Sequence, residues 1–124
     1  MPSDPRRHLG RIGEDLALAH LRRRGFELVA RNHRTRHGEI DLIVCDGETL
    51  VFAEVKTRRA TNAGREPWEA LHPRKRRQVR RMAGAFLAEV EDRPRVPGLR
   101  CDAIGIVIDP RGQLISLDHL EGAF

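Results

Sequence analysis

The order of the elements in this chain predicts an α/β fold with a mixed central β-sheet. An amphipathic helical stretch opens the chain, three short apolar runs with turn residues between them follow, and a second helical stretch precedes two further strands. That order, αβββα followed by a strand pair, is typical of a sheet with helices packed on it. Because the chain has 124 residues, 40% hydrophobic and 33% charged, we expect residues 1–124 to form a single globular domain.

The first half of the chain is expected to fold into a helix and three strands. The helix should cover residues 5–24, because Asp4 can cap it, Pro5 suits the first helical position and Gly25 follows its end. Apolar runs predict strands at residues 26–32, 38–45 and 50–57. Residues 46–49 would then form the turn of a hairpin between the second and third strands.

The second half is expected to contain a basic helix and a closing strand pair. Residues 58–67 form a polar loop, which either closes over a substrate or is an ordinary exposed connection. A helix should begin at Pro73 and continue to about Val90, because apolar residues recur along one face of it. After a Pro-rich connection, strands are expected at residues 101–109 and 113–117. Turn hydrogen bonding is the ordinary explanation for Asp102 and Asp109 at the strand ends.

The positive charge of the chain is concentrated in three segments. The net charge is +5, and residues 22–24, 31–36 and 72–81 are rich in arginine. Clustered positive charge favours a polyanionic partner such as nucleic acid, although each segment taken alone could be a solvated face. No apolar run approaches the ~20 residues of a membrane span, and the first residues lack the apolar region of a secretion signal. We therefore expect a cytoplasmic protein without membrane contact.

The predicted hairpin brings two acidic residues together. A turn at residues 46–49 places Ile43 opposite Phe52, Asp41 opposite Glu54, and Glu39 opposite Lys56. Directly opposed side chains have Cβ atoms about 4.5–5.5 Å apart. Two carboxylates about 4 Å apart repel by about 4 kcal/mol at an effective dielectric constant near 20. A proton or a cation must therefore lie between Asp41 and Glu54, and Mg²⁺ suits such a pair. The alternative is a buried network of these acids with a lysine that serves only structure.

Lysine is rare in this chain and lies near the acidic residues. Lys56 and Lys75 are two of 23 basic side chains, and the others are arginine. An ammonium group is a compact charge that can orient a water molecule, so Lys56 is a candidate for that role. Lys75 and Gln78 begin the second helix, and Lys75 either reaches the site or is ordinary surface charge. Glu14, on the inward face of the first helix, either adds to the site or lies at its edge.

These motifs resemble the PD-(D/E)XK nuclease superfamily and, more closely, the YraN family of small bacterial proteins. The resemblance covers nearly all of residues 10–124, although Ile40 stands where the name of the superfamily has proline. It implies an αβββαβ restriction-endonuclease-like core with flanking helices, similar to that of archaeal Holliday-junction resolvases. The segments that carry it are Gly13-Glu14, Asn32-His33-Arg34, residues 38–43, residues 52–58, Lys75 and Arg100-Cys101-Asp102.

The resemblance also implies a chemistry. Asp41 and Glu54, with the Val55 carbonyl, would bind Mg²⁺ or Mn²⁺, Lys56 would handle the attacking water, and Glu14 matches the helix glutamate of the resolvase-like branch. The implied activity is a metal-dependent endonuclease that hydrolyses phosphodiester bonds of branched or structured DNA. Such a role favours a homodimer, because four-way junctions have two-fold symmetry. Residues expected to contact nucleic acid, DNA more than RNA, are Arg34, Arg58, Arg74, Lys75, Arg77, Gln78 and Arg81.

Two other functions remain open from the sequence. A non-catalytic nucleic-acid-binding module with a vestigial metal site would bind with salt-dependent affinity and would not cleave. A protein-interaction domain whose basic face serves solubility would not retain nucleic acid at physiological salt. Stacking on single strands is disfavoured, because only 4% of the residues are Phe, Trp or Tyr.

Overall fold

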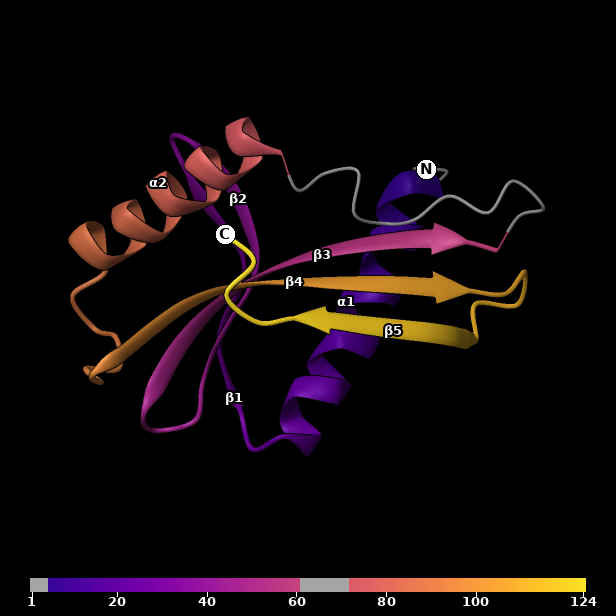
Figure 1. Ribbon diagram of the computed structural model, residues 1–124, viewed down its shortest axis with the longest axis horizontal. Helices are drawn as coiled ribbons and strands as arrows, with labels where there is room; N and C mark the ends of the chain where they lie inside the picture. Colours follow the sequence, from indigo (N-terminus) through magenta and orange to yellow (C-terminus); the bar gives the residue numbers. More distant parts are fainter. Residues whose placement is uncertain (1–4, 61–71) are drawn as a thin grey trace.

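The computed structural model describes residues 5–60 and 72–124, and the elements follow the predicted order (Figure 1). The strand of residues 38–45 is confirmed to the residue. The strand predicted at residues 101–109 covers residues 98–108, and the other three continue two or three residues past their predicted ends. Asp4 and most of the predicted loop at residues 58–67 lie outside the described residues. The elements are α1 (Pro5–Arg23), β1 (Glu27–Thr35), β2 (Gly38–Cys45), β3 (Thr49–Arg59), α2 (Pro73–Glu89), β4 (Gly98–Ile108) and β5 (Leu114–Leu120).

The predicted mixed α/β fold is confirmed. The five strands form one sheet in the order β1-β2-β3-β4-β5. The β3–β4 pair is parallel, and the other three neighbouring pairs are antiparallel. Parallel neighbours need a crossover connection, and the segment containing α2 supplies it. Neither α1 nor α2 has an apolar stretch long enough to cross a bilayer.

Each face of the sheet carries one helix and one apolar core, as the positions of α1 and α2 in Figure 1 indicate. The α1 core contains Leu21, Leu42 and Ile104, each with no exposed surface. The α2 core contains Phe52 and Phe86, whose rings meet edge to face at 5.7 Å. Strand residues therefore alternate between two buried faces, which explains the long apolar runs of β2 and β4.

A glycine brings α1 close to β3. A Cβ atom at Gly13 would overlap the side chain of Thr57, so only glycine allows this approach. The close packing fixes the height of α1 above the sheet. It therefore positions the next residue, Glu14, near the acidic residues of β2 and β3.

Candidate metal and nucleic-acid site

The side chains of strand β2 stop alternating regularly between the two faces of the sheet at Asp41. Leu42 packs in the α1 core and Ile43 in the α2 core, as alternation requires, but Ile40 also packs in the α2 core. The β1–β2 pairs on either side are Arg31–Leu42 and His33–Ile40. Between them lie Asp41 and Asn32, whose backbone adopts the left-handed region with φ of 53°. The sheet is therefore locally irregular at the predicted catalytic aspartate.

The β2–β3 register is confirmed from Cys45–Leu50 to Leu42–Ala53, and the paired residues end there. Asp41 and Glu54 are thus not a regular cross-strand pair. Instead, Asp41 Oδ2 accepts a hydrogen bond from the backbone N–H of Val55 at 2.7 Å. The carboxylate of Asp41 occupies the position where backbone pairing between β2 and β3 would have continued. It consequently lies beside β3 at the residue after Glu54.

The predicted cross-strand pair of Glu39 with Lys56 was wrong. Glu39 pairs in the sheet with Arg34 of β1, and its side chain accepts a hydrogen bond from Asn32 Nδ2 at 2.9 Å. Lys56 is paired with Gly105 of β4. The two strands separate beyond Leu42 and Ala53 because the break at Asp41 turns β2 towards β1.

The acidic residues strongly perturb one another. Burial, followed by the charge of Glu54, raises the pKa of Asp41 to about 8. Burial also raises the pKa of Glu54, although the Lys75 ammonium partly opposes that shift. At neutral pH the protein alone does not supply enough positive charge for both groups to ionise. This electrostatic crowding is what the sequence predicted for the pair.

Lys75 supplies the cation that reaches the site. Its Nζ lies 3.0 Å from Glu54 Oε2 and 3.4 Å from Gln78 Oε1. Gln78 in turn donates to the carbonyl of His37, in the turn between β1 and β2, at 2.9 Å. Of the two alternatives for Lys75, these contacts favour a residue that reaches the site. The other oxygen of Glu54, Oε1, is buried and has no hydrogen-bond partner in the described part of the chain.

Lys56 has a different environment. It lies on the same face of β3 as Glu54, two residues along, and its side chain is exposed. Among residues 5–60 and 72–124 its side chain makes no hydrogen bond or ion pair. Lys56 can therefore contact a ligand that approaches Glu54, whereas Lys75 is committed to the carboxylate.

Glu14 joins the acidic group through β1. Its side chain is 13% exposed, forms an ion pair with Arg31 at 3.2 Å and accepts hydrogen bonds from Asn32 Nδ2 at 3.2 Å. Asn32 thus connects Glu14 with Glu39, a contact that was not predicted. The signal available in the sequence was an asparagine inside a strand, because asparagine tolerates the left-handed conformation better than most residues.

Arginine side chains from α2 line a pocket of about 450 Å³ next to the β1–β2 turn. Four of the α2 residues that were predicted to contact phosphate thus line a single pocket. Arg34, in contrast, is 84% exposed and lies 3.7 Å from Glu39. Arg58 is half-buried on β3. The residues lining the pocket are His37, Arg74, Arg77, Gln78 and Arg81.

Asp41, Glu54 and the Val55 carbonyl suit a divalent cation only if water and substrate supply the remaining ligands. In residues 5–60 and 72–124, no three His, Cys, Asp or Glu side chains are grouped as metal ligands. Mg²⁺ commonly uses one or two carboxylates, and water and phosphate supply the rest. The unpartnered Glu54 Oε1 and the raised pKa of Asp41 both fit a missing positive charge at this point.

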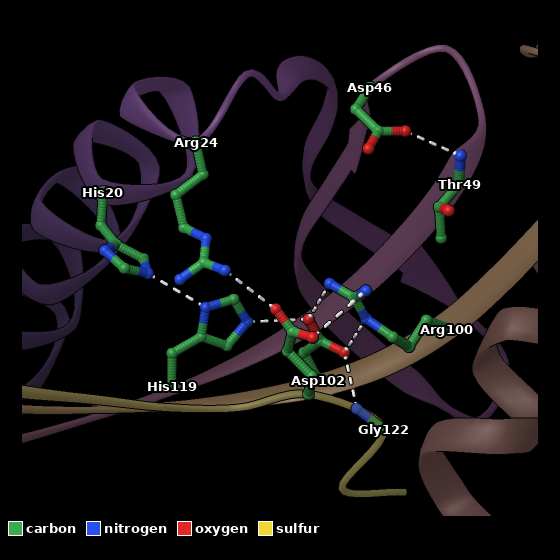
Figure 2. Close-up of polar contacts among 9 residues, drawn as sticks. His20, Arg24, Asp46, Thr49, Arg100, Asp102, His119 and Gly122 are labelled. Atoms are coloured by element: carbon green, nitrogen blue, oxygen red, sulfur yellow. Dashed lines mark hydrogen bonds and ion pairs between the residues drawn. The ribbon is translucent and has the colours of Figure 1, made fainter.

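A second polar cluster lies between β4, β5 and the C-terminal end of α1 (Figure 2). Asp102 has no exposed surface, and it receives two hydrogen bonds from Arg100 at 2.8 and 3.0 Å. His119 Nε2 lies 2.8 Å from its Oδ2, and the N–H of Gly122 donates at 2.9 Å. Burial alone would raise the pKa of Asp102, but the hydrogen bonds from His119 and Arg100 outweigh it and lower the pKa.

The expectation that Asp102 makes turn hydrogen bonds was therefore wrong, whereas Asp109 does accept from the N–H groups of Arg111 and Gln113. His119 continues the cluster to α1, because its Nδ1 lies 3.0 Å from His20 Nε2 (Figure 2). The cluster joins β4, β5 and the end of α1. The sequence signal was an Arg-x-Asp spacing, which places both side chains on one face of a strand.

Comparisons with known proteins give one consistent result. The model of the family described as uncharacterised protein family UPF0102 matches residues 13–106. A UPF0102 protein of Nocardia farcinica is 45% identical over 116 residues, which are 94% of this chain and 88% of that protein. A UPF0102 protein of Frankia casuarinae is 44% identical over 94% of this chain and 95% of its own length. One of Pelotomaculum thermopropionicum is 37% identical over 98% of this chain and 99% of its length.

Proposed function

This chain belongs to the UPF0102 family, the YraN family whose motifs it carries, and we propose that it is a metal-dependent endonuclease acting on structured DNA. The observation that carries the proposal is the half-buried pair of Asp41 and Glu54, with the pKa of Asp41 raised to about 8 and a partnerless oxygen on Glu54. Such perturbation is typical of groups that bind a cation or handle protons. Most buried polar atoms in proteins have a hydrogen-bond partner, so the partnerless oxygen of Glu54 supports a ligand at this position.

Asp41, Glu54 and the Val55 carbonyl would hold Mg²⁺ or Mn²⁺. The ion, when bound, supplies a Lewis acid that polarises a phosphate and lowers the pKa of a bound water molecule. Asp41 is already oriented by the N–H of Val55, so its position does not depend on the ion. Glu54 would exchange its contact with Lys75 for the ion.

The two lysines have separate roles in this proposal. Exposed Lys56 orients the attacking water or stabilises negative charge that develops on the phosphate. Lys75, held 3.0 Å from Glu54, is positioned to meet the same phosphate once Glu54 turns to a cation. The arginines of the α2 pocket hold flanking phosphates without reading bases.

A second candidate is a nucleic-acid-binding module with an idle acidic site. The ion pair of Lys75 with Glu54 favours it, because a lysine that permanently neutralises Glu54 would compete with any divalent cation. In this alternative the protein contacts phosphates but does not cleave nucleic acid. The cytoplasmic location and the homodimer stay predictions under either function.

The nuclease proposal is tested with a supercoiled plasmid and a four-way DNA junction incubated with Mn²⁺. The wild-type protein should nick or cut them, and Asp41→Ala, Glu54→Ala or Lys56→Ala should reduce cutting at least 100-fold, the scale of a lost catalytic group. Lys56→Arg should also lose most activity, because a guanidinium cannot replace a compact ammonium group.

The matched control is Asp118→Ala, which removes an exposed carboxylate from β5 and should cut as well as the wild type. Cutting that persists in all three site variants would contradict the proposal. Binding without cleavage, with Mg²⁺, Mn²⁺, Co²⁺ or Ca²⁺, would favour the idle-site alternative.

A further inference from the structure

A second cationic pocket lies on the other side of the acidic residues, beside the N-terminal half of α1. We propose that it binds a phosphate group of the nucleic acid, so that the bound strand is held on both sides of Asp41 and Glu54. The proposal rests on the proposed function and adds a contact surface to it. The pocket measures about 490 Å³ and is lined by Arg6, Arg7, Gly10, Arg11, Glu14, Asn32, Arg34 and Glu39.

The charge of the pocket is positive once its internal pairs are considered. Arg34 is paired with Glu39 at 3.7 Å, whereas the side chains of Arg7 and Arg11 have no acidic partner among residues 5–60 and 72–124. Glu14 is already paired with Arg31, which does not line the pocket. The first turn of α1 contains no acidic residue, and the positive end of the helix dipole adds to the guanidinium charge. Guanidinium groups bind phosphate in a planar, two-point geometry, so a phosphate is the ligand that this lining suits.

Gly10 gives an independent indication that something approaches α1 here. Glycine inside a helix is less favourable than alanine, so its presence at this position needs a reason. A Cβ atom at Gly10 would meet no described protein atom within 4 Å, unlike the Cβ at Gly13. Residues 5–60 and 72–124 therefore leave room for a side chain at Gly10. Because Gly10 lines the pocket, the space left open is space for a ligand.

The position of the pocket fits a strand that crosses the acidic residues. Glu14 and Glu39 line it, Asn32 joins the two by hydrogen bonds, and Glu39 lies two residues before Asp41 on β2. On the other side of Glu54, Lys75 contacts Gln78, which lines the α2 pocket. The order is therefore α1 pocket, acidic residues, α2 pocket. A backbone lying along it would place one phosphate at Asp41 and Glu54 and its neighbours in the two pockets.

The binding experiment is made in EDTA, where no cleavage occurs, so that it does not depend on catalysis. Fluorescein-labelled DNA is titrated with the wild type and with Arg7→Gln/Arg11→Gln. The double variant should bind at least tenfold more weakly, and the slope of log K against log salt should fall by about 0.9 for each phosphate that the variant no longer neutralises. The control, Arg111→Gln in the exposed β4–β5 turn, should change binding less than twofold.

Three DNA forms distinguish an internal from a terminal phosphate. Covalently closed circles have no ends, linear DNA with 5′-phosphates offers terminal dianions, and the same DNA with 5′-hydroxyls does not. A loss of affinity by Arg7→Gln/Arg11→Gln for all three forms assigns the pocket to internal phosphates. A loss confined to the 5′-phosphorylated form assigns it to the strand end. Equal losses for this variant and Arg111→Gln, or no loss at all, would overturn the proposal.

Gly10→Ala tests the pocket without removing charge. Both Gly10→Ala and its control Gly84→Ala on α2, where a Cβ also meets nothing within 4 Å, should raise the midpoint of thermal unfolding, because alanine favours a helix. Only Gly10→Ala should weaken DNA binding, by several-fold. If the two variants bind alike, the pocket does not receive a ligand. If the protein shows this dependence but never cuts DNA, the proposed nuclease activity is refuted, whereas the proposed phosphate-binding pocket is supported.

Discussion

The ionisation of one residue, Asp41, links folding stability to pH and, in the proposed function, to cation binding. Its pKa rises from an ordinary 3.8 to about 8 in the fold, chiefly through burial and then through Glu54. Between those two values the folded protein holds a proton that the unfolded chain has released. The free energy of unfolding therefore falls as pH rises from 3.8 towards 8. A cation that binds the ionised pair would restore it.

Asp41→Asn should consequently stabilise the protein in alkaline solution. Asparagine keeps an oxygen that can accept from the N–H of Val55 and carries no charge. We expect the free energy of unfolding to rise by about 1–3 kcal/mol at pH 8.5, and by less at pH 5 where Asp41 keeps its proton. Urea unfolding followed by circular dichroism at both pH values measures this. An effect that is the same at pH 5 and pH 8.5 would show that Asp41 does not titrate in this range.

Glu54 provides the test of the ion itself. Millimolar Mn²⁺ should raise the thermal midpoint of the wild type at pH 7.5, because a ligand that binds only the folded state stabilises by mass action. At a concentration 100 times the dissociation constant the gain is about 2.7 kcal/mol. Glu54→Gln should remove the shift, and Asp118→Asn should retain it. A shift of equal size in Glu54→Gln would place the ion elsewhere.

Among the elements, β5 depends most on the polar cluster at Asp102. This strand lies at the sheet edge, and three of its apolar side chains, Leu114, Ile115 and Leu120, are at least 39% exposed. Hydrophobic burial alone therefore attaches β5 weakly. The contacts of Asp102 with Arg100 and His119 hold β4, β5 and the chain end together.

Asp102→Asn should destabilise the protein by about 3–5 kcal/mol at pH 7, because it leaves a buried charge network incomplete. The pKa of Asp102 is lowered in the fold, so the stability that it contributes is present above its unfolded pKa and is lost as pH falls through the lower folded value. The difference between variant and wild type should thus shrink in strong acid. Urea unfolding at pH 7 and pH 3 measures it, and Asp118→Asn should match the wild type at both.

The protein as a whole carries its charge unevenly. The net charge is +5, yet the acidic residues of β2 and β3 lie between two arginine-lined pockets. In the proposed function, the arginines would steer a polyanion onto the surface, and ionised Asp41 and Glu54 would repel it unless a cation were bound. Metal and nucleic acid should therefore bind cooperatively.

This arrangement predicts how salt and divalent cations affect binding. The affinity for duplex DNA should fall linearly on a log–log plot against NaCl concentration, with a slope of about −0.9 per phosphate contacted. Adding non-catalytic Ca²⁺ should tighten binding by the wild type several-fold and should not do so for Asp41→Asn/Glu54→Gln. Fluorescence anisotropy measures both. If Ca²⁺ has the same effect on the two proteins, Asp41 and Glu54 do not contribute to binding.

The sequence by itself determined the order of the elements, the mixed sheet, the β2–β3 register from Cys45–Leu50 to Leu42–Ala53, and the family. These features depend on local signals. Apolar residues with period two or 3.6 specify strands and helices, and a short turn fixes the pairing of its two strands. The identity of Asp41, Glu54 and Lys56 as candidates also came from a short motif, which needs no knowledge of the packing.

Only the tertiary structure decided which charges meet. Lys75 reaches Glu54 because α2 packs across the sheet, and His119 reaches Asp102 because β5 returns along β4. The break at Asp41 replaced the expected cross-strand pair with a side-chain contact to the Val55 N–H. Such contacts join residues far apart in the chain, and their strength depends on burial. The spacing of residues along a strand or helix does not show which distant residues meet in space or which of them are shielded from water.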